Sequence, residues 1–107
     1  MSPVVKKVQP SGILDSTKAS QFREEISHLV SSGADIILVN LKDVTFVDSS
    51  GLGALVSALK IVRSSSGKLC LCSINEQVRM LFELTSMDRV FEVYPSEDDF
   101  LSAIEST

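Results

Sequence analysis

Two spacings of apolar residues alternate along the chain, one typical of α-helices and one typical of β-strands. The first helical stretch carries apolar residues three and four positions apart: Ala19, Phe22, Ile26, Leu29 and Val30. This stripe predicts a helix that begins near Ser16 or Thr17 and runs to about Ser31, with Gly33 as its stop. Charged residues on the same helix, Arg23 among them, are expected to face water.

A second helical stretch follows directly on the short apolar run at residues 44–47. From Leu52 onward the apolar residues again fall on one helical face: Leu55, Val56, Leu59 and Val62. Asp48, Ser49 and Ser50 therefore lie in the turn that opens this helix. In such a turn, side-chain oxygens can accept hydrogen bonds from free backbone N–H groups.

Short apolar runs elsewhere predict strands at residues 4–8, 36–39, 69–73 and 90–94. Two further helices are expected, one opened by a capping box that begins at Ser73 and one by a similar cap at Ser96. Strands that alternate with helices favour the α/β class. The expected fold is a mostly parallel or mixed sheet of about four strands with covering helices, in a single domain over residues 1–107.

The composition narrows the classes of function. The chain has 107 residues, of which 44% are hydrophobic, and this suits one domain with one core. Acidic residues outnumber basic ones by 14 to 10 without a basic patch, so nucleic-acid binding is not expected. No apolar run reaches the roughly 18 residues of a membrane span, and the N-terminus has no signal-peptide pattern. A cytoplasmic protein without membrane contact is expected.

Cys70 and Cys72 are the two cysteines and lie two positions apart in a predicted strand. That spacing puts both on one face with poor geometry for a disulfide, and two thiols do not complete a zinc site. Both are expected to be buried thiols. His28, the sole histidine, falls beside the apolar stripe of its helix and is expected at the surface.

Enzymatic functions find little support around Ser50. A hydrolase nucleophile would need the motif Gly-x-Ser-x-Gly, which is absent, and His28 would be the only available base. Gly51 and Gly53 match the start of a dinucleotide-binding fingerprint, but Val56 stands where its third small residue belongs. A receiver domain needs several acids around Mg²⁺, and the first strand supplies no acidic pair. No catalytic residue, metal site or cofactor is therefore expected.

The turn at residues 48–50 does suit a phosphate. Its small hydroxyls are expected to be exposed at the positive end of a helix dipole. Gly51 and Gly53 lack a Cβ, which would let another molecule approach the backbone. The same residue types are also ordinary helix caps and turn residues, so the pattern alone leaves both interpretations open.

Asp48-Ser49-Ser50-Gly51-Leu52-Gly53 resembles the signature of the STAS domains of bacterial anti-sigma factor antagonists. Gly12-Ile13-Leu14-Asp15 resembles the short motif that precedes the first helix of that family, and the similarity runs from about Gly12 to the C-terminus. STAS domains commonly open with two strands paired as a hairpin before this short motif. This chain has room for one good strand and a remnant of the other, so a shortened first edge strand is expected.

The resemblance implies a switch protein rather than an enzyme. In that family the serine directly before the glycine is phosphorylated by a partner anti-sigma factor kinase, and the corresponding residue is Ser50. The unphosphorylated form would bind the anti-sigma factor, a PP2C-type phosphatase would reset the protein, and ATP and Mg²⁺ would belong to the kinase. The residues expected to contact the partner are Asp15, Asp48, Ser49, Ser50, Gly51, Leu52 and Gly53.

An alternative is a STAS scaffold in a larger assembly, such as an accessory subunit of a transporter, in which phosphorylation has no role. The intact Asp-Ser-Ser-Gly sequence favours the switch protein. Co-purification with an ATP-binding kinase rather than with membrane components would distinguish the two hypotheses.

Overall fold

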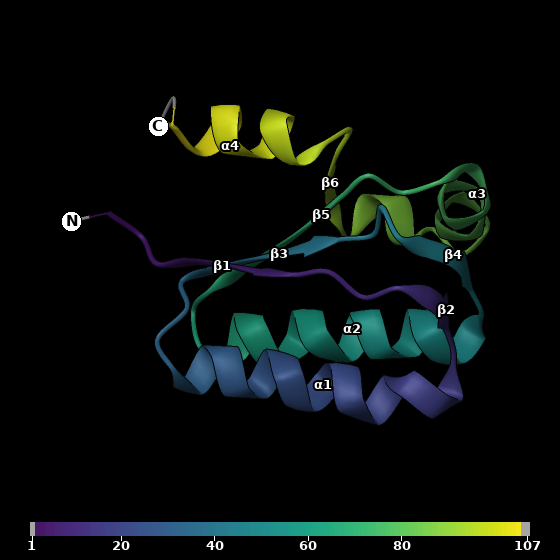
Figure 1. The fold of residues 1–107 in the computed structure, drawn as a ribbon, viewed down its shortest axis with the longest axis horizontal. Helices are drawn as coiled ribbons and strands as arrows, with labels where there is room; N and C mark the ends of the chain where they lie inside the picture. The colour runs from purple at the N-terminus through teal and green to yellow at the C-terminus, as the bar shows by residue number, and fades with distance from the viewer. Residues whose placement is uncertain (1, 106–107) are drawn as a thin grey trace.

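Strands and helices alternate along the chain in the computed structural model, which describes residues 2–105 (Figure 1). The strands are β1 (Val5–Val8), β2 (Gly12–Leu14), β3 (Ile36–Asn40), β4 (Val44–Val47), β5 (Lys68–Cys72) and β6 (Glu92–Tyr94). The helices are α1 (Ser16–Ser31), α2 (Ser49–Ser64), α3 (Glu76–Leu84), the 3-10 turn η1 (Met87–Arg89) and α4 (Glu97–Glu105). The α/β class expected from the sequence is confirmed.

Four strands form the main sheet in the order β1-β3-β5-β6. Every pairing in this sheet is parallel, so of the two arrangements left open by the sequence the parallel one is found. The aliphatic run of β3 lies at its centre, with Val39 paired to Val8 on one side and to Leu71 on the other. A strand covered on both faces can be apolar throughout, which explains the uninterrupted run.

β2 and β4 form a separate two-stranded parallel sheet, with Ile13 opposite Phe46 and Leu14 opposite Val47. The expectation for the N-terminal strands needs a correction here. The motif Gly12-Ile13-Leu14, which the sequence placed only before the first helix, is itself the strand β2. It pairs with β4, which lies beyond α1 and β3 in the sequence, and not with β1. The short turn at residues 9–11 therefore links two sheets and does not close a hairpin.

The helices cover the two faces of the main sheet unequally. Figure 1 shows α1 and α2 side by side on one face and α4 on the opposite face, with α3 beside β4 at one end. The larger apolar core lies beneath α1 and α2. A smaller cluster lies beneath α4 and is formed by four buried residues: Leu38, Cys70, Cys72 and Phe100.

Local capping explains where the helices begin. α1 has the bounds expected from its apolar stripe. The cap of α4 is as predicted, because Ser96 Oγ accepts from the Asp99 N–H at 3.2 Å. The predicted cap of α3 is wrong: Asn75, not Ser73, caps this helix by accepting from the Val78 N–H at 2.9 Å. Ser73 instead takes a left-handed backbone conformation with φ of 60°.

Both cysteines are buried free thiols in β5, and His28 is exposed, as the sequence predicted. Among residues 2–105, no helix is both long and apolar enough to cross a membrane.

Candidate functional site

Two strand–aspartate–helix junctions lie side by side at one end of the molecule. β2 leads through Asp15 into α1, and β4 leads through Asp48 into α2. Leu14 and Val47 are paired, and the Asp48 N–H donates to the Leu14 carbonyl at 3.3 Å. The N-termini of α1 and α2 are consequently neighbours, as Figure 1 shows.

Asp48 is the N-cap of α2. Its Oδ1 accepts from the Gly51 N–H at 2.8 Å, which satisfies one of the free donors of the first turn. Ser49 and Ser50 follow as the first two helical residues, and both are exposed. The sequence predicted this placement, and the cap fixes the residue at which the helix begins.

Asp15 caps α1 in the same way. Its carboxylate accepts from the Thr17 N–H at 3.0 Å and from the Thr17 hydroxyl at 2.5 Å. The hydroxyl bond is the main cause that holds the pKa of Asp15 below its ordinary value. The carboxylate is therefore ionised at neutral pH at the junction beside Ser49 and Ser50.

Gly51 and Gly53 have different surroundings, and this corrects one expectation. Gly51 is buried, and a Cβ there would lie only 2.0 Å from the Leu14 carbonyl oxygen. It lets β2 lie close to α2 and offers no approach to another molecule. Gly53 is exposed, and a Cβ there would meet nothing within 4 Å, so the open backbone predicted from the sequence is found at Gly53 alone. Leu52 is half-buried against the core.

A hollow of about 380 Å³ runs between α1 and α2 beside Ser50. Its walls are Ser16, Ala19 and Arg23 from α1, and Ser50, Gly53 and Ser57 from α2. Arg23 is half-buried here, whereas the sequence placed it on a face turned to water. The signal was present in the sequence, since both sets of residues share the spacing of three and then four positions that marks one helical face.

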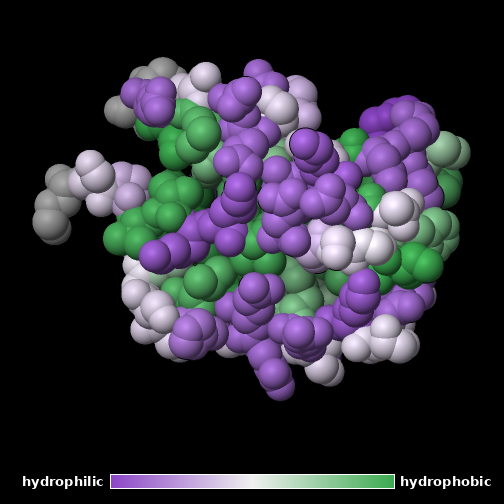
Figure 2. Space-filling view, in the orientation of Figure 1, coloured by the Kyte–Doolittle hydropathy of each residue, from purple (hydrophilic) through white to green (hydrophobic). Residues whose placement is uncertain are grey.

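Two exposed apolar side chains adjoin the junctions and were not singled out from the sequence. Ile13 and Phe46 are paired across the β2–β4 sheet and are 49% and 45% exposed. Figure 2 shows hydrophobic residues reaching the surface at the end of the molecule where α3, β2 and β4 lie. The pairing of two strands that are distant in sequence brings these side chains together, so no local sequence pattern predicts that they are neighbours.

α3 supports the strand that carries the site. Gln77 accepts from the Val47 N–H and donates to the Val47 carbonyl, both at 2.9 Å. The Asn75 amide donates to the Val44 carbonyl at 3.2 Å and to the Thr45 carbonyl at 3.1 Å. These two side chains bond the backbone at the edge of β4 that no strand covers. They fix β4 as far as Val47, the residue before Asp48.

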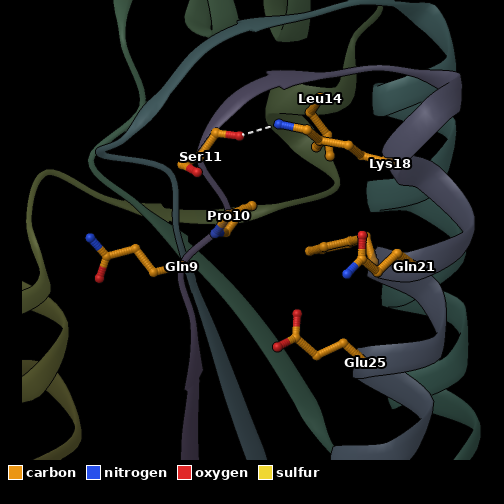
Figure 3. A pocket seen from close by; sticks show the side chains of 8 residues that line it. Gln9, Pro10, Ser11, Leu14, Lys18, Gln21 and Glu25 are labelled. Carbon is orange, nitrogen blue, oxygen red and sulfur yellow. Dashed lines mark hydrogen bonds between the residues drawn. The ribbon is translucent and has the colours of Figure 1, made fainter.

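A second pocket, of about 230 Å³, lies between the turn at residues 9–11 and α1 (Figure 3). Lys18 Nζ donates to the Ser11 carbonyl at 2.6 Å across it, which ties the turn before β2 to α1. Gln21 and Glu25 line the helix side. This pocket positions β2 and does not include Ser50.

The family model described as the STAS domain matches residues 2–100. The chain belongs to the STAS domain family. Over 87 residues it is 33% identical to the anti-sigma-B factor antagonist of Bacillus subtilis, covering 81% of this chain and 79% of that protein.

Solved structures agree with this assignment. A crystal structure of a candidate anti-sigma factor antagonist from Thermotoga maritima superposes with a TM-score of 0.85 at 29% identity, covering 92% of this chain and 86% of that one. SpoIIAA of Bacillus in its phosphorylated form superposes with a TM-score of 0.69 at 20% identity, covering 92% and 88%. The latter likeness concerns the fold alone.

Proposed function

We propose that this protein is an anti-sigma factor antagonist that acts in the cytoplasm as a single STAS domain in a partner-switching system. One observation carries the proposal: an exposed Ser50 follows the Asp48 cap in a chain 33% identical to an anti-sigma-B factor antagonist. The unphosphorylated protein binds an anti-sigma factor and so frees the sigma factor that it held. The anti-sigma factor, acting as a serine kinase, phosphorylates Ser50, and this dissociates the complex. A PP2C-type phosphatase then removes the phosphate and restores the binding form of the protein.

Ser50 rather than Ser49 is the acceptor in this proposal. Both are exposed, but Ser50 directly precedes Gly51, which is the position phosphorylated in the family that the signature resembles. A fold relative, SpoIIAA, has a solved phosphorylated form. This chain supplies the hydroxyl only, while the kinase supplies ATP, Mg²⁺ and the catalytic groups, so no catalytic step is assigned to this protein.

The phosphate acts at the interface and leaves the fold unchanged. A phosphoserine carries about −1.5 to −2 charges at neutral pH. At a helix N-terminus that charge is favourable by roughly 0.3–1 kcal/mol, so α2 has no reason to unfold. In a complex the same group must lose water beside the Asp48 and Asp15 carboxylates, where like charges repel. An unfavourable free energy of ~3 kcal/mol there lowers the affinity about a hundredfold.

The partner surface extends from Ser50 over the β2–β4 sheet. Ile13 and Phe46 supply apolar area at its centre, while Asp15 and Ser49 lie at its rim. An apolar patch with a polar rim is the usual composition of a protein interface. The scaffold alternative is not adopted, because the relative of 33% identity is an antagonist and Asp48-Ser49-Ser50-Gly51 is intact.

Phosphorylation mapping tests the proposal. The anti-sigma factor kinase captured from the native cell is incubated with the parent, with Ser50→Ala and with the matched control Ser49→Ala, and phosphopeptides are identified by mass spectrometry. We expect phosphate on the parent and on Ser49→Ala but not on Ser50→Ala, and we expect Ser50→Ala to keep binding the kinase. Ser50→Asp should keep its fold by circular dichroism and bind at least tenfold more weakly. Phosphate on Ser49, or unchanged binding of Ser50→Asp, would contradict the assignment.

A further inference from the structure

Arg23 shares the α1–α2 hollow with Ser50. On α1 the hollow is lined by Ser16, Ala19 and Arg23, and the matching face of α2 carries Ser50, Gly53 and Ser57. The two helices start at neighbouring junctions and run side by side, so Arg23 lies about two turns beyond the level of Ser50.

Arg23 has no ionic partner among the described residues of the unmodified protein. Among residues 2–105, none of the carboxylates lies within ion-pair distance of its guanidinium. Its one hydrogen bond runs from Nη2 to Ser20 Oγ at 3.3 Å, which is long for such a bond. The half-buried guanidinium of Arg23 lines the hollow and has N–H donors that are not used in hydrogen bonds to the described residues. It is therefore suited to bind an anion in the hollow.

The side chain of Arg23 points in the required direction. Helical side chains tilt toward the N-terminus of their helix, and the contact with Ser20 shows that the guanidinium reaches back almost one turn. The residues that lie between it and Ser50 are small: Ala19 has one methyl group, and Gly53 has none. No atom lies within 4 Å of the position that a Cβ at Gly53 would take, so no side chain crosses the hollow at that point.

We propose that Arg23 binds the phosphate group of phosphorylated Ser50 across the α1–α2 hollow. This deepens the proposed function and needs from it only that Ser50 carries the phosphate. The planar guanidinium offers paired N–H donors that match phosphate oxygens. The nearby Asp15 and Asp48 carboxylates oppose the added charge, and Arg23 offsets this repulsion from the other end of the hollow. The phosphate then stays dianionic at lower pH and bridges α1 to α2 beside the surface assigned to the partner.

The test measures the second pKa of the phosphate by phosphorus NMR. Phosphoserine is incorporated at position 50 during translation, in the parent and in the Arg23→Gln and Arg23→Lys variants. Arg63→Gln is the matched control, because it removes the same charge as Arg23→Gln. Arg63 is exposed and lies in the last turn of α2, at the opposite end of the helix from Ser50. An unperturbed phosphoserine has a second pKa of about 6. We expect Arg23→Gln to raise the second pKa of the parent by roughly 0.2–0.7 units, the range for an exposed ion pair.

The other variants decide between a specific contact and net charge. Arg63→Gln should leave the second pKa where it is in the parent, and Arg23→Lys should give an intermediate value because it keeps the charge but not the fork. In 1 M NaCl the difference between the parent and Arg23→Gln should shrink. Equal pKa values in the parent and Arg23→Gln, or equal shifts in both glutamine variants, would overturn the proposal.

The result is independent of the kinase. Phosphoserine is incorporated at position 50 without the kinase, so an unchanged pKa in Arg23→Gln would argue against the role of Arg23 alone. The proposed function would fail in a different experiment, if the kinase placed the phosphate on another residue.

Discussion

Gly51 and Gly53 lie two positions apart in the first turns of α2, yet they serve different purposes. Gly51 allows the backbone of β2 to lie against α2, because any Cβ would overlap the Leu14 carbonyl. Gly53 keeps the floor of the hollow beside Ser50 free of side-chain atoms. Gly51 is therefore required by the fold, whereas the fold places no steric restriction on position 53.

Alanine substitutions at the two glycines should change stability in opposite directions. Gly51→Ala should lower the free energy of unfolding by about 1–3 kcal/mol, because the added methyl group must displace the Leu14 backbone. Gly53→Ala should raise it by about 0.5–1 kcal/mol, because alanine is the better helix former and meets open space. Urea unfolding followed by circular dichroism measures both. Similar values for the two variants would show that the contact with Leu14 is not the reason for Gly51.

At the scale of elements, the two-stranded β2–β4 sheet is the part that organises the site. Each of its strands ends in a capping aspartate, so the pairing of the strands brings the starts of α1 and α2 together. The same pairing places Ile13 beside Phe46 on the surface, and Gln77 and Asn75 from α3 cover the free edge of β4. About half of each of these two side chains is exposed, so a partner that covers them buries further apolar area.

Phe46→Ser should weaken binding to the partner anti-sigma factor while the domain stays folded by circular dichroism. Phe46 is 45% exposed, so burying its remaining surface in an interface contributes roughly 0.7–1.4 kcal/mol, and the dissociation constant should rise about 3- to 10-fold. Isothermal titration calorimetry with the purified partner measures it. Leu84→Ser is the control, since Leu84 is 82% exposed on α3 and lies outside the proposed surface. Equal binding by Phe46→Ser and the parent would remove Phe46 from the interface.

At the scale of the whole molecule, α4 closes the second face of the sheet over a small core that contains the two thiols. Cys70 lies beneath Phe100, and its Sγ contacts Glu92 Oε2 at 3.5 Å. Burial, more than the nearby carboxylate, raises the pKa of the Cys70 thiol to about 12. Glu92 in turn accepts from the Tyr94 hydroxyl and thereby raises the pKa of Tyr94 to about 12.

The free energy of unfolding should therefore fall as the pH rises above about 9, the ordinary pKa of a thiol. Above that pH the unfolded chain releases the Cys70 proton while the folded protein retains it up to a pH of about 12. Each such proton reduces stability by up to about 1.4 kcal/mol per pH unit. Urea unfolding under reducing conditions at pH 8, 9 and 10 should show a shallower fall for Cys70→Ala than for the parent. Parallel curves would show that burial does not hold this thiol protonated.

The sequence by itself determined what depends on near neighbours. The bounds of α1 follow from its own periodicity, and the placement of Ser49 and Ser50 follows from Asp48 as a cap. The buried thiols and the central position of β3 could also be predicted, because an uninterrupted apolar strand has to be covered on both faces. These signals are local, since the hydrogen bonds and apolar stripes that define them lie within a few positions of one another.

Only the tertiary structure decided what depends on residues far apart in the chain. Three residues of β2 carry too little pattern to name a partner, so its pairing with β4 rather than β1 could not be predicted. The buried place of Gly51 follows from that pairing, because the Leu14 carbonyl reaches α2 only when β2 lies beside β4. Arg23 and Ser50 likewise share a hollow only because α1 and α2 lie side by side. A periodic pattern shows which residues share one face of a helix, whereas the element that packs against this face depends on the tertiary structure.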